Sequence, residues 1–270
     1  LADPNLGLGA SLSRYYNSIQ GVADDPSSIS SRQLMLAEAQ GLGDRFADLS
    51  AQLDSLGREV NVRISTSVSD INDLATQIAD INLLISESRG KFGTTPNDLL
   101  DQRDQALLSL NELIGIKSVE QNDGTVSVFV GNGEALVLGE RTIKMNAVSN
   151  VFEPGRIEVA MDMGGGQAVI SSSLSGGSLG GSLNFRDGLL NETRNELGRI
   201  SLAVASSMNE QNRAGIDLRG NQGGDLFSVP DPVVHRSLNN ISATQMTAQI
   251  SDLSQLTGNN VLMRFNGTNW

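Results

Sequence analysis

An acidic cluster at the start of a predicted helix is the part of the sequence whose residue types could do chemistry. The stretch TTPNDLLDQRDQALLSLNELIG, residues 94–115, places Asp98, Asp101, Arg103 and Asp104 within two helical turns. Paired carboxylates are the acid–base groups of glycoside hydrolases. Acids are also favoured in the first turns of a helix, where they interact with the positive end of the helix dipole. The cluster therefore has a catalytic and a structural interpretation.

The residues around the cluster favour the structural interpretation. Thr95 suits the N-cap of a helix and Pro96 suits its first position, so the acids fall where helices normally carry them. Hydrolysis would also need a pocket with sugar-binding side chains, and the chain has only one Trp and two Tyr. We expect Arg103 to form an ion pair with a neighbouring element. No residue is assigned a catalytic role, and the chain is predicted not to be an enzyme.

The other candidates for a metal or cofactor site lack partners. His235, in PDPVVHRS, is the single histidine of a chain without cysteine, so neither a conventional zinc site nor a Ser-His-Asp triad can be assembled around it. We expect it to lie in an exposed loop. The stretch DLRGNQGGD, residues 217–225, looks like a calcium loop, but Arg219 stands at a ligand position and Ser228 replaces the closing Glu. A tight turn is predicted there, and no metal or cofactor is expected.

Composition excludes several classes of partner. The 270 residues carry a net charge of −12, and nucleic-acid phosphates require a basic surface. No apolar run approaches the roughly 18 residues that a membrane-spanning helix needs. The absence of cysteine excludes disulfides and thiolate chemistry. Nucleic acid and membrane are therefore not expected partners.

Helices dominate the elements that must position these residues. Apolar residues step by four and three along residues 35–85, close to a coiled-coil repeat, which predicts a helix of about 75 Å if it is continuous. A bend is expected over residues 60–69, where β-branched residues and Ser lower helix propensity. The predicted helices span about residues 5–22, 28–88, 96–115 and 180–213.

Strands are predicted between the third and fourth helices. Val126, Val128 and Val130 alternate with other side chains between glycine-containing turns, which indicates a small antiparallel β-unit over about residues 116–163. The glycine clusters at 164–166 and 176–182 match no phosphate-binding loop and are interpreted as a flexible connection and a helix start.

These elements predict an α+β fold in two parts. Residues 1–215 are expected to form an elongated bundle of long helices with flanking β-hairpins, and residues 216–270 to begin a mostly β domain. The start, LADPNLGLG, has no signal-peptide pattern, and the end, VLMRFNGTNW, stops within a predicted hairpin. We expect the chain to be an internal fragment of a longer protein.

Four blocks resemble the bacterial flagellar hook-associated proteins of the FlgK type. PNDLLDQRDQALLSLNELIGI followed by NDGTVSVFVGNGEALVLG is similar to the family's N-D-L-L-D-x-R-D signature, helix and hairpin. LSRYYNSIQGVADDPSSISSRQLMLAEAQGLGDRF is similar to the start of its long helix, although residues 27–31 are Ser-rich where the family has Ala or Asp. The fourth block, from GGSLGGSLNFRD to GIDLRGNQGGDLF, is similar to its last long helix, with the FRD, MN and G-x-D-L-x-G motifs.

The resemblance implies a structural protein with no enzymatic activity. Family members join the flagellar hook to the filament, are extracellular, and are exported by the flagellar type III apparatus without a cleavable signal peptide. The implied partners are identical subunits, bound through terminal arms absent here, the hook protein, the second junction protein of the FlgL type and an export chaperone. Without those arms we expect this fragment to be monomeric.

Three alternatives stay open. The first is another exported filament or junction protein, such as a flagellin or the partner hook-associated protein of the FlgL type; flagellin normally lacks the NDLLDQRD block. A carbohydrate-active enzyme would use Asp98, Asp101 or Asp104. An adhesin-like coiled-coil binder would need a ligand site that the sequence does not reveal.

Overall fold

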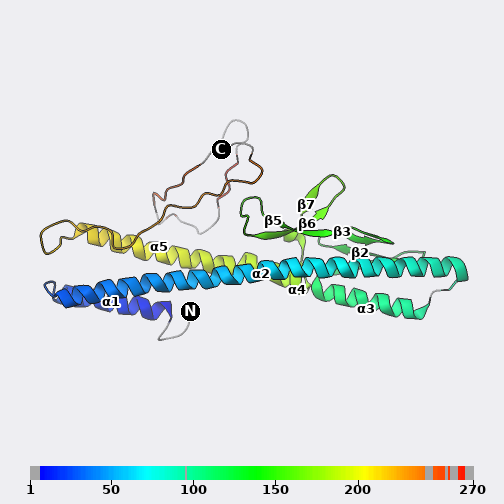
Figure 1. The fold of residues 1–270 in the computed structure, drawn as a ribbon, viewed down its shortest axis with the longest axis horizontal. Coiled ribbons are helices and arrows are strands. Elements are labelled where there is room, and N and C mark those ends of the chain that lie inside the picture. Colours follow the sequence, from blue (N-terminus) through cyan, green and yellow to red (C-terminus); the bar gives the residue numbers. More distant parts are fainter. Residues whose placement is uncertain (1–6, 95, 241–245, 253–254, 256–260, 265–270) are drawn as a thin grey trace. The chain divides into compact units, whose positions relative to one another are not determined.

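The fold is α+β, as the sequence predicts, and consists of two compact units. The computed structural model describes residues 7–94, 96–240, 246–252, 255 and 261–264 (Figure 1). One unit, which we call the helical unit, comprises Leu1–Ser55, Leu190–Val234 and Met246–Trp270. The other, the mixed unit, comprises Leu56–Leu189 and His235–Gln245. Among the described residues, no helix combines the length and the apolar character needed to cross a bilayer.

The helical unit is built on three helices. Helix α1 (Leu8–Asp24), the first part of α2 (Ile29–Phe92) and α5 (Asn191–Ala214) supply its core. Tyr15 and Leu42 are almost fully buried there. Within residues 35–85, the positions Met35, Ala39, Phe46 and Leu49 of the predicted 4-3 spacing lie in this core. The other members are apolar residues of α1 and α5 and one residue after α5: Leu8, Leu12, Ile19, Leu197, Ile200, Val204, Met208 and Phe227.

Polar side chains at the beginning of α2 explain why a long helix starts after Pro26. Ser28 precedes the first helical residue, and its Oγ accepts a hydrogen bond from the backbone N–H of Ser31 at 3.2 Å. This is the N-cap arrangement, which satisfies a backbone donor that has no partner within the helix. Asp25 prepares the turn by accepting from the N–H of Ser27 at 3.2 Å. The Ser-rich departure from the family pattern therefore caps the helix.

The mixed unit combines helices with two antiparallel sheets. One sheet has the order β1 (Ile116–Glu120), β2 (Val126–Val130), β3 (Glu134–Leu138) and β4 (Arg141–Thr142). The other has the order β5 (Met145–Ser149), β6 (Ile157–Asp162) and β7 (Gln167–Val169). The helical elements of the unit are the second part of α2, α3 (Asn97–Leu113), a short 3₁₀ turn η1 (Ser171–Ser173) and α4 (Gly177–Phe185).

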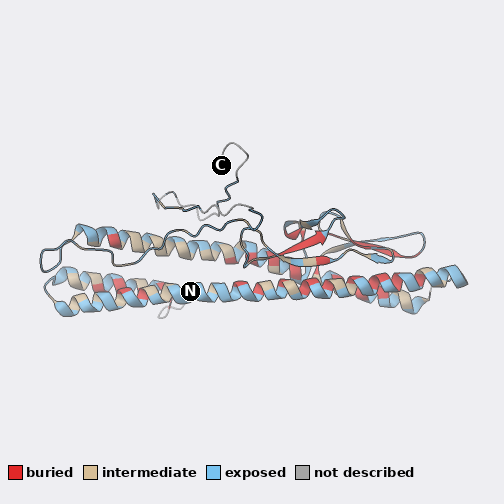
Figure 2. Ribbon diagram, turned by 45° about the horizontal axis from the view of Figure 1, so that its top comes forward, coloured by how far each residue is buried: buried red, intermediate tan, exposed pale blue. Residues whose placement is uncertain are grey.

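Strands cover much of the apolar face of α2 in the mixed unit. The predicted positions Val60, Ile64, Val68, Ile71 and Ile78 are all buried (Figure 2). They share one core with apolar residues of both sheets and of α3 and α4: Ala106, Leu110, Val126, Val128, Val130, Leu136, Val137, Met145, Val159, Met161, Leu179 and Leu183. The spacing along α2 predicts a buried face but not what covers it, and in this unit strands cover it together with α3 and α4.

The glycine cluster at 176–182 contains the start of α4, and Gly176 and Gly177 pack there against backbone. Gly176 and Gly177 have φ of 75° and 59°, which favour glycine, and a Cβ on Gly177 would lie 2.4 Å from the backbone N of Ile114. The N–H of Gly115 donates to the carbonyl of Ser175 at 3.0 Å. The end of α3 and the start of α4 therefore approach so closely that side chains cannot fit between them.

Several element boundaries differ from the predicted ones. Helix α2 is uninterrupted through residues 60–69, and the bend expected there stays a prediction. Helix α3 begins at Asn97 with Pro96 as its N-cap residue, one position later than expected, and Thr95 lies outside the described residues. The predicted helix over 180–213 consists of α4, a π-helical turn η2 (Arg186–Leu190) and α5.

The mostly β domain expected from residue 216 also stays a prediction. In the described part of the chain after residue 215, the backbone forms a single isolated β-bridge, between Ile216 and Gln222. The hairpin expected around Asn266 and Gly267 lies outside the described residues.

Candidate functional site

The three aspartates of the acidic cluster do not converge. Asp98, Asp101 and Asp104 are all exposed on α3, with Asp98 in its first turn. Arg103, between them in sequence, is 7% exposed and faces the interior of the mixed unit. A pair of carboxylates working on a bound sugar must face a common space, and these side chains lie on the outer surface of a helix. The cluster is therefore a helix start whose acids face water.

Arg103 binds the turn between β1 and β2. Its Nη1 donates a hydrogen bond to the carbonyl of Gly124 at 3.0 Å. Its nearest carboxylate is that of Asp104 in the same helix, at 3.6 Å from Nε. The expected ion pair with a neighbouring element is wrong: Arg103 does bind a neighbouring element, but through a backbone carbonyl. This contact joins the NDLLDQRD block to the NDG turn.

The turn itself is held by its own side chains. Asp123 Oδ1 accepts from the hydroxyl of Thr125 at 2.7 Å and from its backbone N–H at 2.9 Å. These hydrogen bonds, with a smaller attraction from Arg89 of α2, lower the pKa of Asp123 below its ordinary value. Gly124 has φ of 85°, and a Cβ there would lie 2.4 Å from the Arg89 guanidinium. Arg103 of α3 thus binds this turn, and Arg89 of α2 lies beside it.

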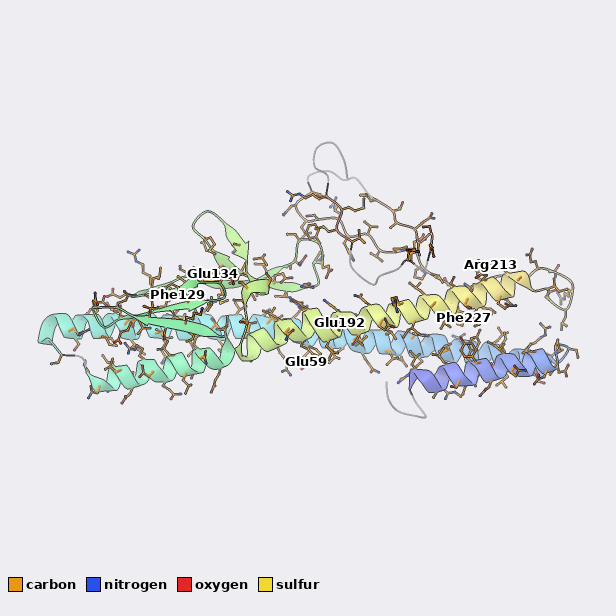
Figure 3. The ribbon with its side chains drawn as sticks, turned by 180° about the vertical axis from the view of Figure 1, so that it is seen from behind. Glu59, Phe129, Glu134, Glu192, Arg213 and Phe227 are labelled. Carbon is orange, nitrogen blue, oxygen red and sulfur yellow. The ribbon has the colours of Figure 1, made fainter. Side chains whose placement is uncertain are left out.

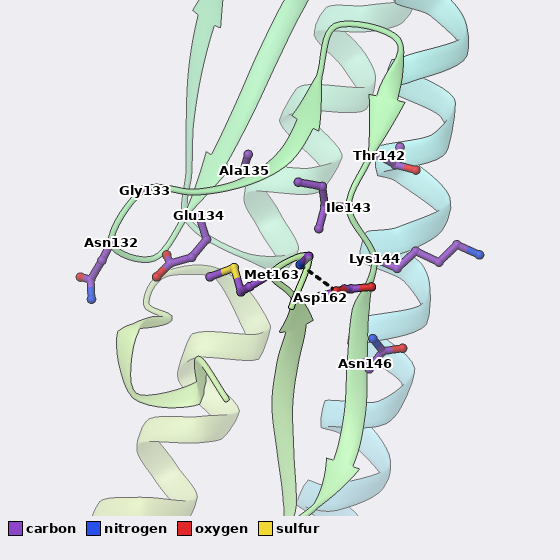
Figure 4. Close-up of a pocket in the computed structure, with 11 residues that line it drawn as sticks. Asn132, Gly133, Glu134, Ala135, Thr142, Ile143, Lys144, Asn146, Asp162 and Met163 are labelled. Carbon is purple, nitrogen blue, oxygen red and sulfur yellow. Dashed lines mark hydrogen bonds between the residues drawn. The ribbon is translucent and has the colours of Figure 1, made fainter. Parts of the chain in front are cut away.

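An open pocket lies elsewhere on the mixed unit (Figure 4). It encloses about 1050 Å³ and is lined by residues that include Glu134, Ile143, Lys144, Asp162 and Met163, with none of the three aspartates of α3. Asp162 accepts a hydrogen bond from the backbone N–H of Gly164 at 2.9 Å and so closes a turn. Across the residues with described placement, no group of three His, Cys, Asp or Glu side chains is arranged to hold a metal ion.

A buried ionic network joins β6 to the end of α4. Glu158 and Arg186 are each 4% exposed, and the carboxylate accepts from Arg156 Nε at 2.7 Å and from Asn150 Nδ2 at 3.0 Å. Arg186 Nη2 lies 3.4 Å from the second carboxylate oxygen. Burial alone would raise the pKa of Glu158, but hydrogen bonds from Ser171, Asn150 and Arg156 and the charge of Arg186 together hold it below its ordinary value.

Asp187 completes this network at the π-helical turn. Its carboxylate accepts from Arg186 Nε at 2.6 Å and lies 3.1 Å from Arg156 Nη2. Arg186 also donates to the backbone carbonyl of Ile157. The FRD motif thus supplies a buried arginine and its acidic partner, which bind the start of β6, the central strand of the second sheet.

Two asparagines of α2 bind strand backbone as a neighbouring strand would. Asn72 donates to the carbonyl of Met145 and accepts from its N–H, both at 2.9 Å. Asn82 accepts from the N–H of Val126 at 3.0 Å and donates to the carbonyls of Val126 and Gly139 at 2.8 and 2.7 Å. Because a side-chain amide carries the same donor and acceptor as a peptide group, it can satisfy both backbone atoms at once.

A third asparagine of α2 behaves in the same way. Asn61 donates to the carbonyl of Gly155 at 2.6 Å and accepts from the N–H of Ile157 at 3.1 Å. We call Asn61, Asn72 and Asn82 the amide clamps. Sequence reasoning missed them. The one clamp that the sequence could have indicated is Asn82, because it is a polar residue within the apolar run INLLI. In the structure its side chain is fully buried.

In the helical unit, Asn209 of α5 holds the segment that follows the helix. Its Oδ1 accepts from the N–H groups of Leu226 and Phe227 at 2.8 and 2.9 Å, and its Nδ2 donates to the carbonyl of Phe227 at 2.8 Å. Figure 3 labels Phe227. Its ring meets that of Tyr15 edge-on, with centroids 5.9 Å apart. Asn209 therefore fixes Phe227 in the core of this unit.

Residues 217–225, which look like a calcium loop in the sequence, form a tight turn, as predicted. Asp217 accepts from the side chain of Asn221 at 3.0 Å, and from the backbone N–H groups of Asn221 and Arg219, both at 2.8 Å. These bonds, led by the Asn221 amide, lower the pKa of Asp217. His235 is exposed, which is also as predicted.

The family model of the flagellar hook-associated protein FlgK helical domain matches residues 1–227. The chain belongs to this FlgK family. Arg103, Arg186, Asn209 and Asp217 lie in the motifs that carry the resemblance, and each of them makes a contact that holds backbone in place. In this FlgK chain the motifs are therefore structural.

Curated relatives agree with this assignment. Flagellar hook-associated protein 1 of Salmonella typhimurium is 37% identical over 274 residues, covering all of this chain and 50% of the relative. The protein of the same name from Escherichia coli K12 is 33% identical over 273 residues, with the same coverage. The chain thus spans about half the length of the curated FlgK relatives that it matches.

A solved structure shares the FlgK fold. The flagellar hook junction protein FlgK from Burkholderia pseudomallei superimposes with a TM-score of 0.87 at 31% identity. The match covers 95% of this chain and 47% of the other.

Proposed function

We propose that the protein carrying this segment is a structural component of the bacterial flagellum that joins the hook to the filament. The observation that carries the proposal is the match of the FlgK helical domain to residues 1–227. The contacts of the motif residues support it, because Arg103 and Arg186 are used to bind backbone and neighbouring charges within the fold. Residues used in this way are typical of a structural scaffold.

Complementation tests the proposal. The full-length protein is expressed in a motile bacterium whose own hook–filament junction protein has been deleted, and filament attachment is scored by electron microscopy beside swimming. We expect attached filaments and restored motility. A strain that exports the protein and still sheds its filament subunits into the medium would contradict the proposal.

The proposal extends to assembly. Identical subunits, the hook protein and the second junction protein of the FlgL type are its partners, and the chain reaches the outside of the cell through the flagellar type III apparatus with the help of a chaperone. The names of the relatives, hook-associated protein 1 and hook junction protein, support this placement. The 270-residue segment alone is monomeric; light scattering after size exclusion would contradict this by detecting a stable ring.

The enzymatic alternative makes a different prediction for Asp101. Asp101→Asn in the full-length protein removes a carboxylate from an exposed helix face. We expect unchanged filament attachment and no polysaccharide turnover in either form. Turnover by the native protein that disappears in the folded variant would establish a hydrolase instead.

A further inference from the structure

The three amide clamps are spread along one side of α2. Asn61, Asn72 and Asn82 are 11 and 10 residues apart, which is close to three helical turns each time. At 1.5 Å per residue, the first and the last are about 32 Å apart along the helix. Each reaches the backbone of a segment at least 44 residues away in sequence.

The clamps are divided between the two sheets. Asn82 holds the first sheet, since it binds Val126 at the start of β2 and Gly139 after β3. Asn72 and Asn61 hold the second sheet, through Met145 at the start of β5 and Ile157 at the start of β6. Each sheet is therefore attached to α2 by its own set of clamps.

Amide clamps add a directional constraint to the apolar packing. The core between α2 and the strands is held by Val, Ile and Leu side chains, whose attraction has no preferred direction. A clamp requires a donor and an acceptor to be aligned together, and a hydrogen bond weakens steeply once its distance or angle leaves a narrow range. A sheet that slid along α2 by one residue would lose these hydrogen bonds, with the largest cost at Asn82, whose side chain is fully buried, while Asn61 and Asn72 are half-buried.

We propose that Asn61, Asn72 and Asn82 form a register lock that fixes the position of each sheet along α2 independently of the other. The lock goes beyond the proposed function, since it concerns how the mixed unit holds its own shape. It makes the sheets separable: loss of one clamp loosens the sheet that it holds and leaves the other sheet in place.

Hydrogen exchange of the full-length protein tests the lock. Asn82→Asp keeps the acceptor oxygen but sets a carboxylate oxygen against the carbonyls of Val126 and Gly139. We expect backbone amides of β2 and β3 to exchange about ten- to a hundredfold faster, with β5 and β6 close to the native rate. Asn72→Asp is expected to give the reverse pattern. Asn132→Asp adds the same charge in the exposed turn between β2 and β3 and should leave both sheets unchanged.

The exchange rates of the two sheets, compared with each other, decide whether the register lock exists. Equal acceleration of both sheets by either clamp variant would make the clamps ordinary contributors to stability and overturn the lock, as would native exchange in both. If the Asp variants lack native circular dichroism, Asn72→Gln and Asn82→Gln replace them, because they keep the amide but displace it by one methylene; the same sheet-by-sheet criterion applies. The measurement uses purified protein, so a failure to complement motility would count against the proposed function alone.

Discussion

At the scale of single residues, the acidic cluster that resembles catalytic machinery places three aspartates on the surface and one arginine, Arg103, against the protein's own backbone. The helical repeat places Arg103 on a different side of the helix from Asp98, Asp101 and Asp104, and the sequence predicts this separation. It does not predict that the partner is the carbonyl of Gly124, because nothing local relates α3 to a turn 21 residues away. The identity of a tertiary partner depends on how the sheet docks.

Arg103 is expected to be needed for stability where Asp101 is not. Arg103→Ala removes the donor to the buried Gly124 carbonyl and leaves a void, so the free energy of unfolding should fall by about 1–3 kcal/mol. Asp101→Asn, on the exposed face of the same helix, should change it by less than about 0.5 kcal/mol. Urea denaturation followed by circular dichroism measures both. Equal effects of the two substitutions would show that Arg103 has no such role.

Glu158 is expected to make stability depend on acid pH. Its pKa is lowered on folding, so its contribution is complete at neutral pH and declines as the pH falls below the ordinary value of about 4.5 and through the lower folded value. Glu158→Gln should cost about 1.5–3 kcal/mol at pH 7, since Arg156 and Arg186 lose a charged acceptor.

Comparing the native protein with Glu158→Gln separates the pH dependence that Glu158 causes from that of the other carboxyl groups. In urea titrations from pH 7 to pH 3, the native protein should lose more stability than Glu158→Gln, and the two curves should converge at the acid end. Parallel curves over the whole range would mean that the ionisation of Glu158 is not linked to folding.

At the scale of elements, the sequence predicts buried faces better than their partners. The 4-3 spacing of α2 marks Ile64, Ile71 and Ile78 as buried, and they are. The same spacing gives no information on whether a helix or a sheet covers that face. The clamps escape prediction for a related reason: an Asn on a helix is ordinarily a solvated residue, and only the docked strand reveals its use.

Glycines at the α3–α4 crossing provide a prediction about elements. Gly177→Ala places a methyl group 2.4 Å from backbone at a residue with φ of 59°, and it should destabilise the protein by more than about 2 kcal/mol. Gly181→Ala, in α4 with no atom within 4 Å of the new methyl group, should stabilise it by up to about 1 kcal/mol. Thermal unfolding checks the pair. Equal tolerance of the two changes would contradict a close approach of the α4 start to the end of α3.

At the scale of the whole molecule, the chain spans about half the length of its curated relatives. The motifs through which its family is recognised hold the fold together. A junction between hook and filament must carry the load of a rotating filament. Within the mixed unit, the register lock proposes that the amide clamps oppose sliding of the sheets along α2, in addition to the apolar core. The proposed function and the register lock therefore meet in one measurable property, the retention of filaments under shear.

The double variant Asn72→Asp/Asn82→Asp of the full-length protein, in the complemented strain, should assemble filaments in still medium but lose them faster than the native protein when the culture is sheared. The reason is that the clamp hydrogen bonds are lost while the apolar core that drives folding remains. Asn132→Asp, with the same change of charge per site, should retain its filaments. Filament length and number are counted by electron microscopy after graded shear. If the double variant and the native protein retained their filaments equally, the register lock would not contribute to the mechanical strength of the junction. This would hold even where hydrogen exchange had shown that the lock exists.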